Sequence, residues 1–419
     1  MRAQTQETLC LEASVRVHGI EVEGFGLSCR AGNLVARASR PLLLSPADTG
    51  EKEKYPNLSF GRDKVRMLRT GQGEAAGKIK MKEMEFTGGR VLSTKAQQTC
   101  SDSSIRSDWT REAVRGIYNR PLLDLVFSAQ QIHRLHHQPN EVQCCQLLSI
   151  KTGGCPEDCA YCPQSAHFAT GIGRQPLLPL AEVVETARRA QAEGATRFCM
   201  GAAWRQAPEG EEFDRVLEMV RAVASLGMEV CCTLGMLTQE QANCLGEAGL
   251  TAYNHNLDTS PEYYRNIITT RTYGDRLRTL AAVRKSGVTV CCGGIIGMGE
   301  GDEDRVGLLQ QLASLSPHPE SVPINLLERV EGTPLAQTEP LDPFTMVRTI
   351  ATARILMPAS KVRLSAGRRS VTRECAALCF LAGANSIFVG EKLLTTPNPD
   401  RDEDQQLFRD LGIQPMCRA

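Results

Sequence analysis

Short apolar runs alternate with amphipathic stretches along the chain from Trp109 onward. Each run ends in small or polar residues, and in each amphipathic stretch the apolar positions repeat at the spacing of a helix. Runs that are apolar almost throughout are typical of parallel strands covered on both faces, so this alternation predicts βαβ units. The predicted strands are 146–150, 196–202, 228–234, 252–258, 288–297, 321–327, 361–366 and 386–389.

Eight strands in this order fit an α/β fold, a closed (β/α)8 barrel of the TIM type. The segment 110–137 before the first strand is also helical in pattern and is expected to form an N-terminal cap on the barrel. An open, doubly wound sheet is the alternative fold, but such sheets normally contain fewer strands. The helices predicted between the strands include 181–193, 213–226, 239–248, 276–285 and 343–357.

The first 105 residues differ in character from the rest. They contain polar, Gly-rich segments such as 49–54 and 70–74 and are expected to be mostly disordered or loosely structured. A targeting segment and a mispredicted start codon both fit this region, although transit peptides contain fewer acidic residues than are found here. The expected organisation is an extension over 1–105, a barrel over 106–412 and a tail over 413–419.

The composition is ordinary for a globular protein, with 42% hydrophobic and 23% charged residues. The 48 basic and 48 acidic residues cancel, which gives no electrostatic reason to expect nucleic acid or a membrane surface as a partner. No secretory signal or membrane span is visible, so we expect a soluble intracellular protein. The expected compartment is the cytoplasm, or the mitochondrial matrix if the extension is a targeting segment. In a reducing compartment, 17 cysteines indicate metal or thiol chemistry.

Three cysteines lie in a C-x3-C-x2-C loop directly after the first predicted strand: Cys155, Cys159 and Cys162. In a barrel this loop opens on the face where chemistry takes place. A cubane iron–sulfur cluster takes one ligand per iron, so three thiolates leave one iron open for a small molecule. Zinc is the alternative, because structural zinc sites also use three cysteines with a fourth ligand, for which His167 is available. The spacing favours iron–sulfur over zinc.

Further cysteines lie within the predicted strands: Cys199, the pair Cys231–Cys232 and the pair Cys291–Cys292. Side chains alternate along a strand, so only one member of each pair can face the barrel interior. One thiol from each of three strands could converge on a single site, although buried free cysteine is also a common small core residue. Arg363 in another apolar strand favours the site, because an isolated buried charge is costly.

Polar residues alternate in the segment 253–258, where Asn254, Asn256 and Asp258 share one face of the predicted strand. Such side chains either form hydrogen bonds to a ligand in the barrel or cap the end of the strand. Asn325 ends another apolar strand in a similar way.

Glycines are concentrated at 293–299, at the end of a predicted strand. They allow the backbone to approach a planar ligand closely, but tight packing within the barrel is the favoured interpretation. A dinucleotide-binding loop is a weak match, since the required strand–helix context with an acidic partner is missing.

Taken together, these residues resemble the biotin synthase family of the radical S-adenosylmethionine (SAM) superfamily. The resemblance extends over roughly residues 110–412. The matching phrases are 148–153, 162–165, 199–204, 253–260, 362–368, 384–388 and 393–396.

The resemblance implies two iron–sulfur clusters. Cys155, Cys159 and Cys162 would hold a 4Fe–4S cluster whose open iron is chelated by the amino and carboxylate groups of SAM. A 2Fe–2S cluster would be held by Cys199, Cys231, Cys291 and Arg363, the flanking residues selecting one member of each cysteine pair.

The resemblance also implies contacts with SAM and the substrate. Asn256 and Asp258 would contact the ribose of SAM or the substrate ring, and Asn325 would contact the substrate. Tyr161 would lie beside SAM, and the segment around Gly297 would pass its adenine.

The implied reaction is the insertion of sulfur into dethiobiotin to give biotin, the last step of biotin biosynthesis. A 5′-deoxyadenosyl radical from SAM would abstract hydrogen from two saturated carbons, and the 2Fe–2S cluster would donate the sulfur. An electron donor of the flavodoxin or ferredoxin type and a homodimeric state are further expectations from the family.

Other functions remain as alternatives. Lipoyl synthase would require a second motif, C-x4-C-x5-C, before the barrel, and the sequence has none. A cluster-assembly maturase need not retain the three strand cysteines together with Arg363. A non-catalytic iron–sulfur sensor or scaffold would bind SAM without turnover, and a zinc-binding structural module would hold no iron.

Overall fold

The computed structural model describes residues 11–17, 20–30, 33–38, 66–68 and 105–416. The chain divides into two compact units, residues 1–99 and 100–419. In the first unit, strands β1 (Leu11–Val17), β2 (Ile20–Arg30), β3 (Asn33–Ala38) and β4 (Arg66–Leu68) form an antiparallel sheet in the order β3-β2-β1-β4. Apolar residues alternate in β1, which is the pattern of a strand. The other residues of the expected extension, and with them its suggested targeting role, lie outside the described residues.

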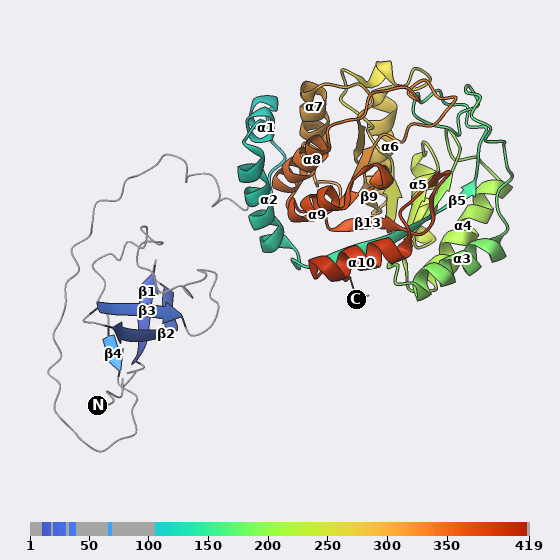
Figure 1. Ribbon diagram of the computed structural model, residues 1–419. Helices are drawn as coiled ribbons and strands as arrows, with labels where there is room; N and C mark the ends of the chain where they lie inside the picture. Colours follow the sequence, from blue (N-terminus) through green and yellow to red (C-terminus); the bar gives the residue numbers. More distant parts are fainter. Residues whose placement is uncertain (1–10, 18–19, 31–32, 39–65, 69–104, 417–419) are drawn as a thin grey trace, which may run out of the picture. The chain divides into compact units, whose positions relative to one another are not determined.

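The second unit contains the predicted closed barrel of parallel strands (Figure 1). All neighbouring strands pair in parallel, and β11 closes the circle by pairing with both β9 and β10. Two predicted strands differ from expectation, since 252–258 contains only the short β8 and 288–297 is split in two. The strands are β5 (Glu141–Lys151), β6 (Arg197–Ala202), β7 (Glu229–Thr233), β8 (Ala252–Asn254), β9 (Thr289–Cys291), β10 (Gly294–Ile296), β11 (Ser321–Leu326), β12 (Lys361–Leu364) and β13 (Ser386–Val389).

Helices surround the barrel and confirm the predicted positions (Figure 1). They are α3 (Leu180–Ala192), α4 (Glu211–Ala224), α5 (Gln239–Glu247), α6 (Tyr273–Lys285), α7 (Asp302–Ala313), α8 (Pro343–Leu356) and α9 (Arg373–Leu381). The N-terminal segment forms α1 (Arg111–Tyr118) and α2 (Leu122–His136), which pack against α7 and α8. After the last barrel strand come the hairpin of β14 (Lys392–Leu393) and β15 (Thr396–Pro397), then α10 (Arg401–Leu411), and finally β16 (Gln414–Pro415), which pairs with β5. In the part of the chain described here, no helix combines the length and the apolar character needed to cross a membrane.

The barrel closes at two adjacent glycines, Gly293 between β9 and β10 and Gly294 at the start of β10. A Cβ atom on Gly293 would lie 1.9 Å from the carbonyl oxygen of Pro323 on β11, and one on Gly294 would lie 2.3 Å from the side chain of Leu308. These positions accept no side chain because neighbouring backbone and side-chain atoms already occupy the space. Tight packing is therefore the correct interpretation of these two glycines.

We expect Gly293→Ala to lower the free energy of unfolding by about 3 kcal/mol, because the new methyl group must push β9 and β11 apart. Gly116→Ala in α1 is the matched control, since nothing lies within 4 Å of its added Cβ and alanine favours a helix. Denaturant unfolding of the cluster-free protein under anaerobic conditions measures both variants. Equal stability of the two variants would contradict the role of Gly293 in closure.

Candidate active site

A cavity of about 320 Å³ extends from the loops after the barrel strands into the barrel interior. Its size is within the range of small-molecule sites. The loop that follows β5 forms one part of the wall, and residues of β6, β7 and β12 form the deeper part. The cavity thus lies at the C-terminal ends of the strands, where barrel enzymes have their active sites.

The three loop cysteines, Cys155, Cys159 and Cys162, all line this cavity. Backbone hydrogen bonds fold the loop back on itself, with Cys155 N donating to Gln164 O (2.9 Å) and Cys162 N donating to Cys159 O (2.8 Å). Burial raises the pKa of Cys159 to about 11 and that of Cys162 to about 12. In the absence of a metal these thiols stay protonated near neutral pH, and metal binding must displace their protons.

The geometry of the loop argues against the zinc alternative. The ring of His167 is within 3.1 Å of the carbonyl oxygen of Pro156 and is not part of the cavity wall. Among the residues that the structure describes, no three His, Cys, Asp or Glu side chains are grouped around a single ion position. A cluster takes its ligands at separate irons, so the thiols need not converge on one point. Three thiols around a shared cavity therefore fit a cluster better than a zinc ion.

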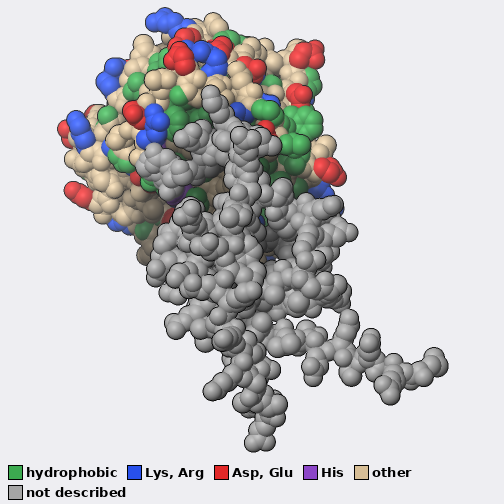
Figure 2. Space-filling view, turned by 90° about the vertical axis from the view of Figure 1, so that its left-hand side faces the viewer, with side chains coloured by type: hydrophobic (Ala, Val, Ile, Leu, Met, Phe, Trp, Pro, Cys, Tyr) green, Lys and Arg blue, Asp and Glu red, His purple; other side chains and the backbone are tan. Residues whose placement is uncertain are grey.

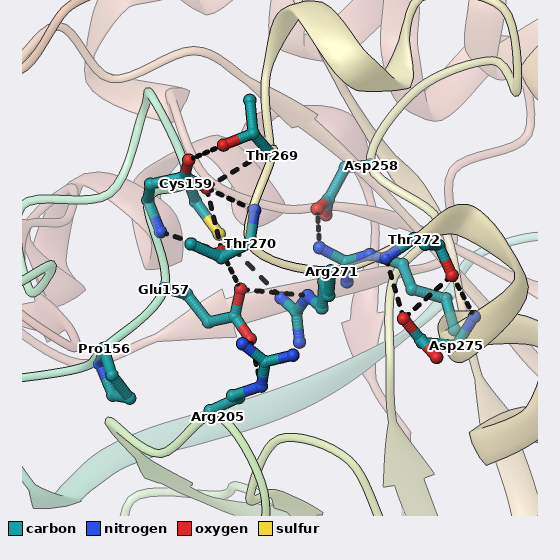
Figure 3. Close-up of polar contacts among 12 residues, drawn as sticks. Pro156, Glu157, Cys159, Arg205, Asp258, Thr269, Thr270, Arg271, Thr272 and Asp275 are labelled. Atoms are coloured by element: carbon teal, nitrogen blue, oxygen red, sulfur yellow. Dashed lines mark hydrogen bonds and ion pairs between the residues drawn. The ribbon is translucent and has the colours of Figure 1, made fainter.

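The acidic residues inside the cysteine motif attach the loop to the segment between β8 and α6 (Figure 3). Asp158 accepts hydrogen bonds from the backbone N–H groups of Thr269 (2.9 Å) and Thr270 (3.1 Å) and from both hydroxyl groups. Burial by itself would raise the pKa of Asp158, but these hydrogen bonds outweigh it and lower the pKa to about 2. Asp158 therefore stays ionised and fixes the loop.

Glu157 is buried and lies between two arginines (Figure 3). Its carboxylate oxygens are 3.5 Å from Arg205 Nε and 3.9 Å from Arg271 Nε, and Arg271 Nη2 reaches to 3.8 Å from Cys159 Sγ. The cysteine pattern alone did not single out Glu157, Asp158 or Arg271. The feature of the sequence that could have identified them is the pair of carboxylates inside C-x3-C. Carboxylates in a buried loop need hydrogen-bond or charged partners.

A second set of thiols lies inside the barrel. Each member comes from a different strand, and all are at most 3% exposed. The cluster contains Cys145, Cys199, Cys231 and Cys291, together with Ala252, Phe388 and Leu393. The adjacent residues Cys144, Cys232 and Cys292 instead pack in the outer core between the sheet and the helices. Strand alternation thus directs one member of each cysteine pair inward.

Arg363 extends into the same interior cluster and is 1% exposed. Its Nη1 is 3.7 Å from Cys291 Sγ, and its Nη2 is 3.3 Å from Cys145 Sγ. Its Nε donates to Ser386 Oγ at 3.0 Å, and the guanidinium lies 4.7 Å from the ring centroid of Phe388. The buried charge is thus surrounded by soft sulfur atoms and an aromatic face.

Amide side chains line the cavity between the strands. Asn254 Nδ2 donates to Cys291 Sγ (3.3 Å) and to Asn256 Oδ1 (3.2 Å), and Asn256 Oδ1 also accepts from Gly293 N. Asn325 is fixed at both ends, donating to Gly294 O (2.9 Å) and accepting from Ala366 N (3.2 Å). These amides are held in place by the barrel itself.

Two predicted contact residues lie elsewhere. Asp258 has a positive φ of 67° and is not part of the cavity wall, because the regular strand ends at Asn254 and alternation stops there. Its carboxylate is paired with Arg276 and accepts a hydrogen bond from Tyr161 Oη at 3.0 Å. Gly297 is also outside the wall, whereas Tyr161 lines the cavity as expected for a residue beside the loop cysteines.

The fold and the three-thiol loop define a barrel of the radical SAM class. The family model described as the Radical SAM superfamily matches residues 149–312, and the model described as the Biotin and Thiamin Synthesis associated domain matches residues 323–414. Methylornithine synthase has a similar structure, with a TM-score of 0.62 and 18% identity over 74% of this chain and 94% of that chain. The FeFe-hydrogenase maturase HydG from Carboxydothermus hydrogenoformans gives a TM-score of 0.63 and 16% identity over 73% and 76%. At such identities the structural likeness shows the fold alone.

Curated relatives are far more similar in sequence. The biotin synthase of Methylobacterium nodulans is 64% identical over 74% of this chain and 94% of its own length. Those of Marinobacter nauticus and of a Synechococcus strain are each 62% identical, covering 75% and 73% of this chain and 90% and 98% of the relatives. The chain belongs to the biotin synthase family.

Proposed function

We propose that this chain forms biotin from dethiobiotin by inserting one sulfur atom with the help of a SAM-derived radical. Membership of the biotin synthase family supports the reaction. The observation that carries the proposal is a single cavity lined by the three loop thiols and by Cys199, Cys231 and Arg363 of the interior set. Cys291 is not part of the cavity wall and packs behind it, against Cys199 and Cys231. A substrate in this cavity can be close to a radical source and a sulfur source at the same time.

The two sets of thiols fit two cofactors of different roles. Cys155, Cys159 and Cys162 would hold a 4Fe–4S cluster with SAM at its open iron. The interior set, namely Cys199, Cys231, Cys291 and Arg363, would hold a 2Fe–2S cluster. When bound, these groups supply a 5′-deoxyadenosyl radical and a sulfur atom, a chemistry for which no side chain is equipped.

The chain's own residues position the substrate and keep water out. Asn256 and Asn325 present amide groups to the cavity, and their existing hydrogen bonds hold them in a fixed orientation suited to the substrate's polar groups. Trp204, Phe388 and Leu393 add apolar surface to the wall. An apolar wall limits access of water to a reactive carbon radical.

The contacts of Asp258 and Gly297 with SAM stay predictions. Asp258 has a buried partner in Arg276, and its connection to the cavity is the hydrogen bond that it accepts from Tyr161, which lines the wall. An electron donor of the flavodoxin or ferredoxin type completes the proposed reaction, since cleavage of SAM requires an electron.

A homodimer is the proposed oligomeric state. Helix α2 exposes Leu123, Phe127 and Leu135, which are 81%, 64% and 67% exposed. At about 100° per residue they spread over about a third of the circumference of the helix, the width of an apolar stripe. Figure 2 views the side on which α1 and α2 lie in Figure 1, and hydrophobic side chains gather there between the charged ones. A second copy of the chain is the occupant that we propose for this stripe.

Cys155→Ala should abolish SAM cleavage, because two remaining thiols cannot hold the outer cluster in an active form. The full-length chain is reconstituted anaerobically with iron and sulfide and incubated with SAM, dethiobiotin and reduced flavodoxin. Mass spectrometry should detect 5′-deoxyadenosine and biotin with the unmodified chain and neither with the variant. Cys244→Ala, in α5 outside the cavity wall, is the control and should keep both products. Normal 5′-deoxyadenosine formation by Cys155→Ala would refute the assignment of the loop.

Cys291→Ala should retain part of the SAM cleavage but lose biotin formation, since only the sulfur source is affected. Cys292→Ala is the matched control, because this adjacent thiol packs in the outer core, whereas Cys291 packs with Cys199 and Cys231 in the interior cluster. The same assay measures both products for each variant. Biotin formation by Cys291→Ala at the level of Cys292→Ala would remove Cys291 from the proposed sulfur-donor site.

Phe127→Asp should convert the dimer to a monomer, because it places a charge in the centre of the apolar stripe. Leu180→Asp at the start of α3 is the control, as Leu180 is a separate apolar residue that is 38% exposed. Light scattering after size-exclusion chromatography gives the molar mass of each variant. An unmodified chain that is monomeric, or a Phe127→Asp variant that stays dimeric, would rule out this interface.

A further inference from the structure

Cys145 belongs to the interior cluster but not to the ligand set proposed above. It lies on β5, is 0% exposed and packs with Cys199, Cys231 and Cys291. Its signal in the sequence is the pair Cys144–Cys145, which repeats the arrangement of the two cysteine pairs on β7 and at β9. Four strands, not three, therefore direct a thiol into the barrel.

The register of the sheet explains why Cys145 meets Arg363. Arg363 on β12 is opposite Ser386 on β13, and Ser386 is opposite Gln143 on β5. Cys145 is two residues further along β5 and therefore shares the inward face with Gln143. Its sulfur lies 3.3 Å from Arg363 Nη2 and 3.7 Å from Ser386 Oγ. Cys145 and the end of Arg363 thus occupy the same corner of the interior.

The two groups differ in what they offer to iron. A charged guanidinium has five N–H donors and no lone pair, so it can bind iron only after losing a proton. A thiolate is the usual protein ligand of iron–sulfur clusters. The guanidinium can also act as a hydrogen-bond donor to sulfur, since its two terminal nitrogens contact the sulfur atoms of Cys145 and Cys291. The corner therefore contains two candidate ligands in contact with each other.

We propose that Cys145 is a reserve ligand of the interior site. When Arg363 is removed, the thiolate of Cys145 binds the iron that is assigned to Arg363. The proposal rests on the 2Fe–2S cluster of the proposed function and adds a fifth protein donor to it. The site then tolerates loss of either Cys145 or Arg363, but not of both. Loss of Cys291 is different, because Cys145 Sγ contacts one nitrogen of the guanidinium and Cys291 Sγ contacts the other, so Cys145 lies at the position of Arg363 and not at that of Cys291.

The test uses the full-length chain reconstituted with isotopically enriched iron, so that Mössbauer spectroscopy measures the iron in each type of cluster. Four variants are compared with the unmodified chain: Arg363→Leu, Cys145→Ala, the double variant of both, and Cys291→Ala. Both single variants should keep the 2Fe–2S signal, and the double variant should lose it as fully as Cys291→Ala does. Arg363→Leu should also show a changed visible absorption and circular dichroism, because sulfur replaces nitrogen at one iron. Cys144→Ala, in the outer core, is the control and should match the unmodified chain.

Retention of the 4Fe–4S signal shows in each variant that the barrel is folded. Loss of the 2Fe–2S signal in either single variant, or its survival in the double variant, would overturn the assignment of Cys145. Failure of the proposed function has a different signature, namely no 2Fe–2S signal in the unmodified chain or a full signal in Cys291→Ala.

Discussion

Closure of the parallel sheet is the constraint on which the rest of the structure depends. In an open sheet, β5 and β9 would be separated by three intervening strands and their inward side chains would not meet. Pairing of β11 with both β9 and β10 closes the circle, and the missing side chain of Gly293 gives β11 the room to approach. Closure therefore turns thiols that are far apart in sequence into one buried cluster.

The two sets of thiols are held by different physical means. The interior thiols project from strands whose backbone hydrogen bonds fix them within a packed core, which suits a cluster that must lie beside the substrate. The loop thiols have no such scaffold, and the ionised Asp158 and the buried Glu157 tie their loop to the segment before α6. The cavity connects the interior of the barrel with the cysteine loop, which is held in place by hydrogen bonds to ionised side chains.

Arg363 shows how the barrel accommodates a buried charge. Arg363 forms no ion pair with a carboxylate of the described residues. It contacts Ser386, the face of Phe388 and the sulfurs of Cys145 and Cys291. Sulfur is a weak acceptor while it is protonated and a strong partner once it is a thiolate bound to iron. With protonated thiols around it, the guanidinium forms only weak hydrogen bonds. The same arrangement stabilises it more strongly when the surrounding sulfur atoms are thiolates that bind iron.

The sequence by itself determined the barrel, six of its eight predicted strands and the cysteine loop, because apolar periodicity and ligand spacing are local properties of the chain. It also established that one member of each strand cysteine pair faces inward. Only the tertiary structure decided which thiols meet, since that depends on register across the closed sheet, and it thereby added Cys145 to the interior set. It likewise withdrew Asp258 from the cavity wall, because β8 ends at Asn254 and a left-handed backbone turns the carboxylate toward Arg276. Pairings between distant segments are set by packing and long-range hydrogen bonds, which no local pattern records.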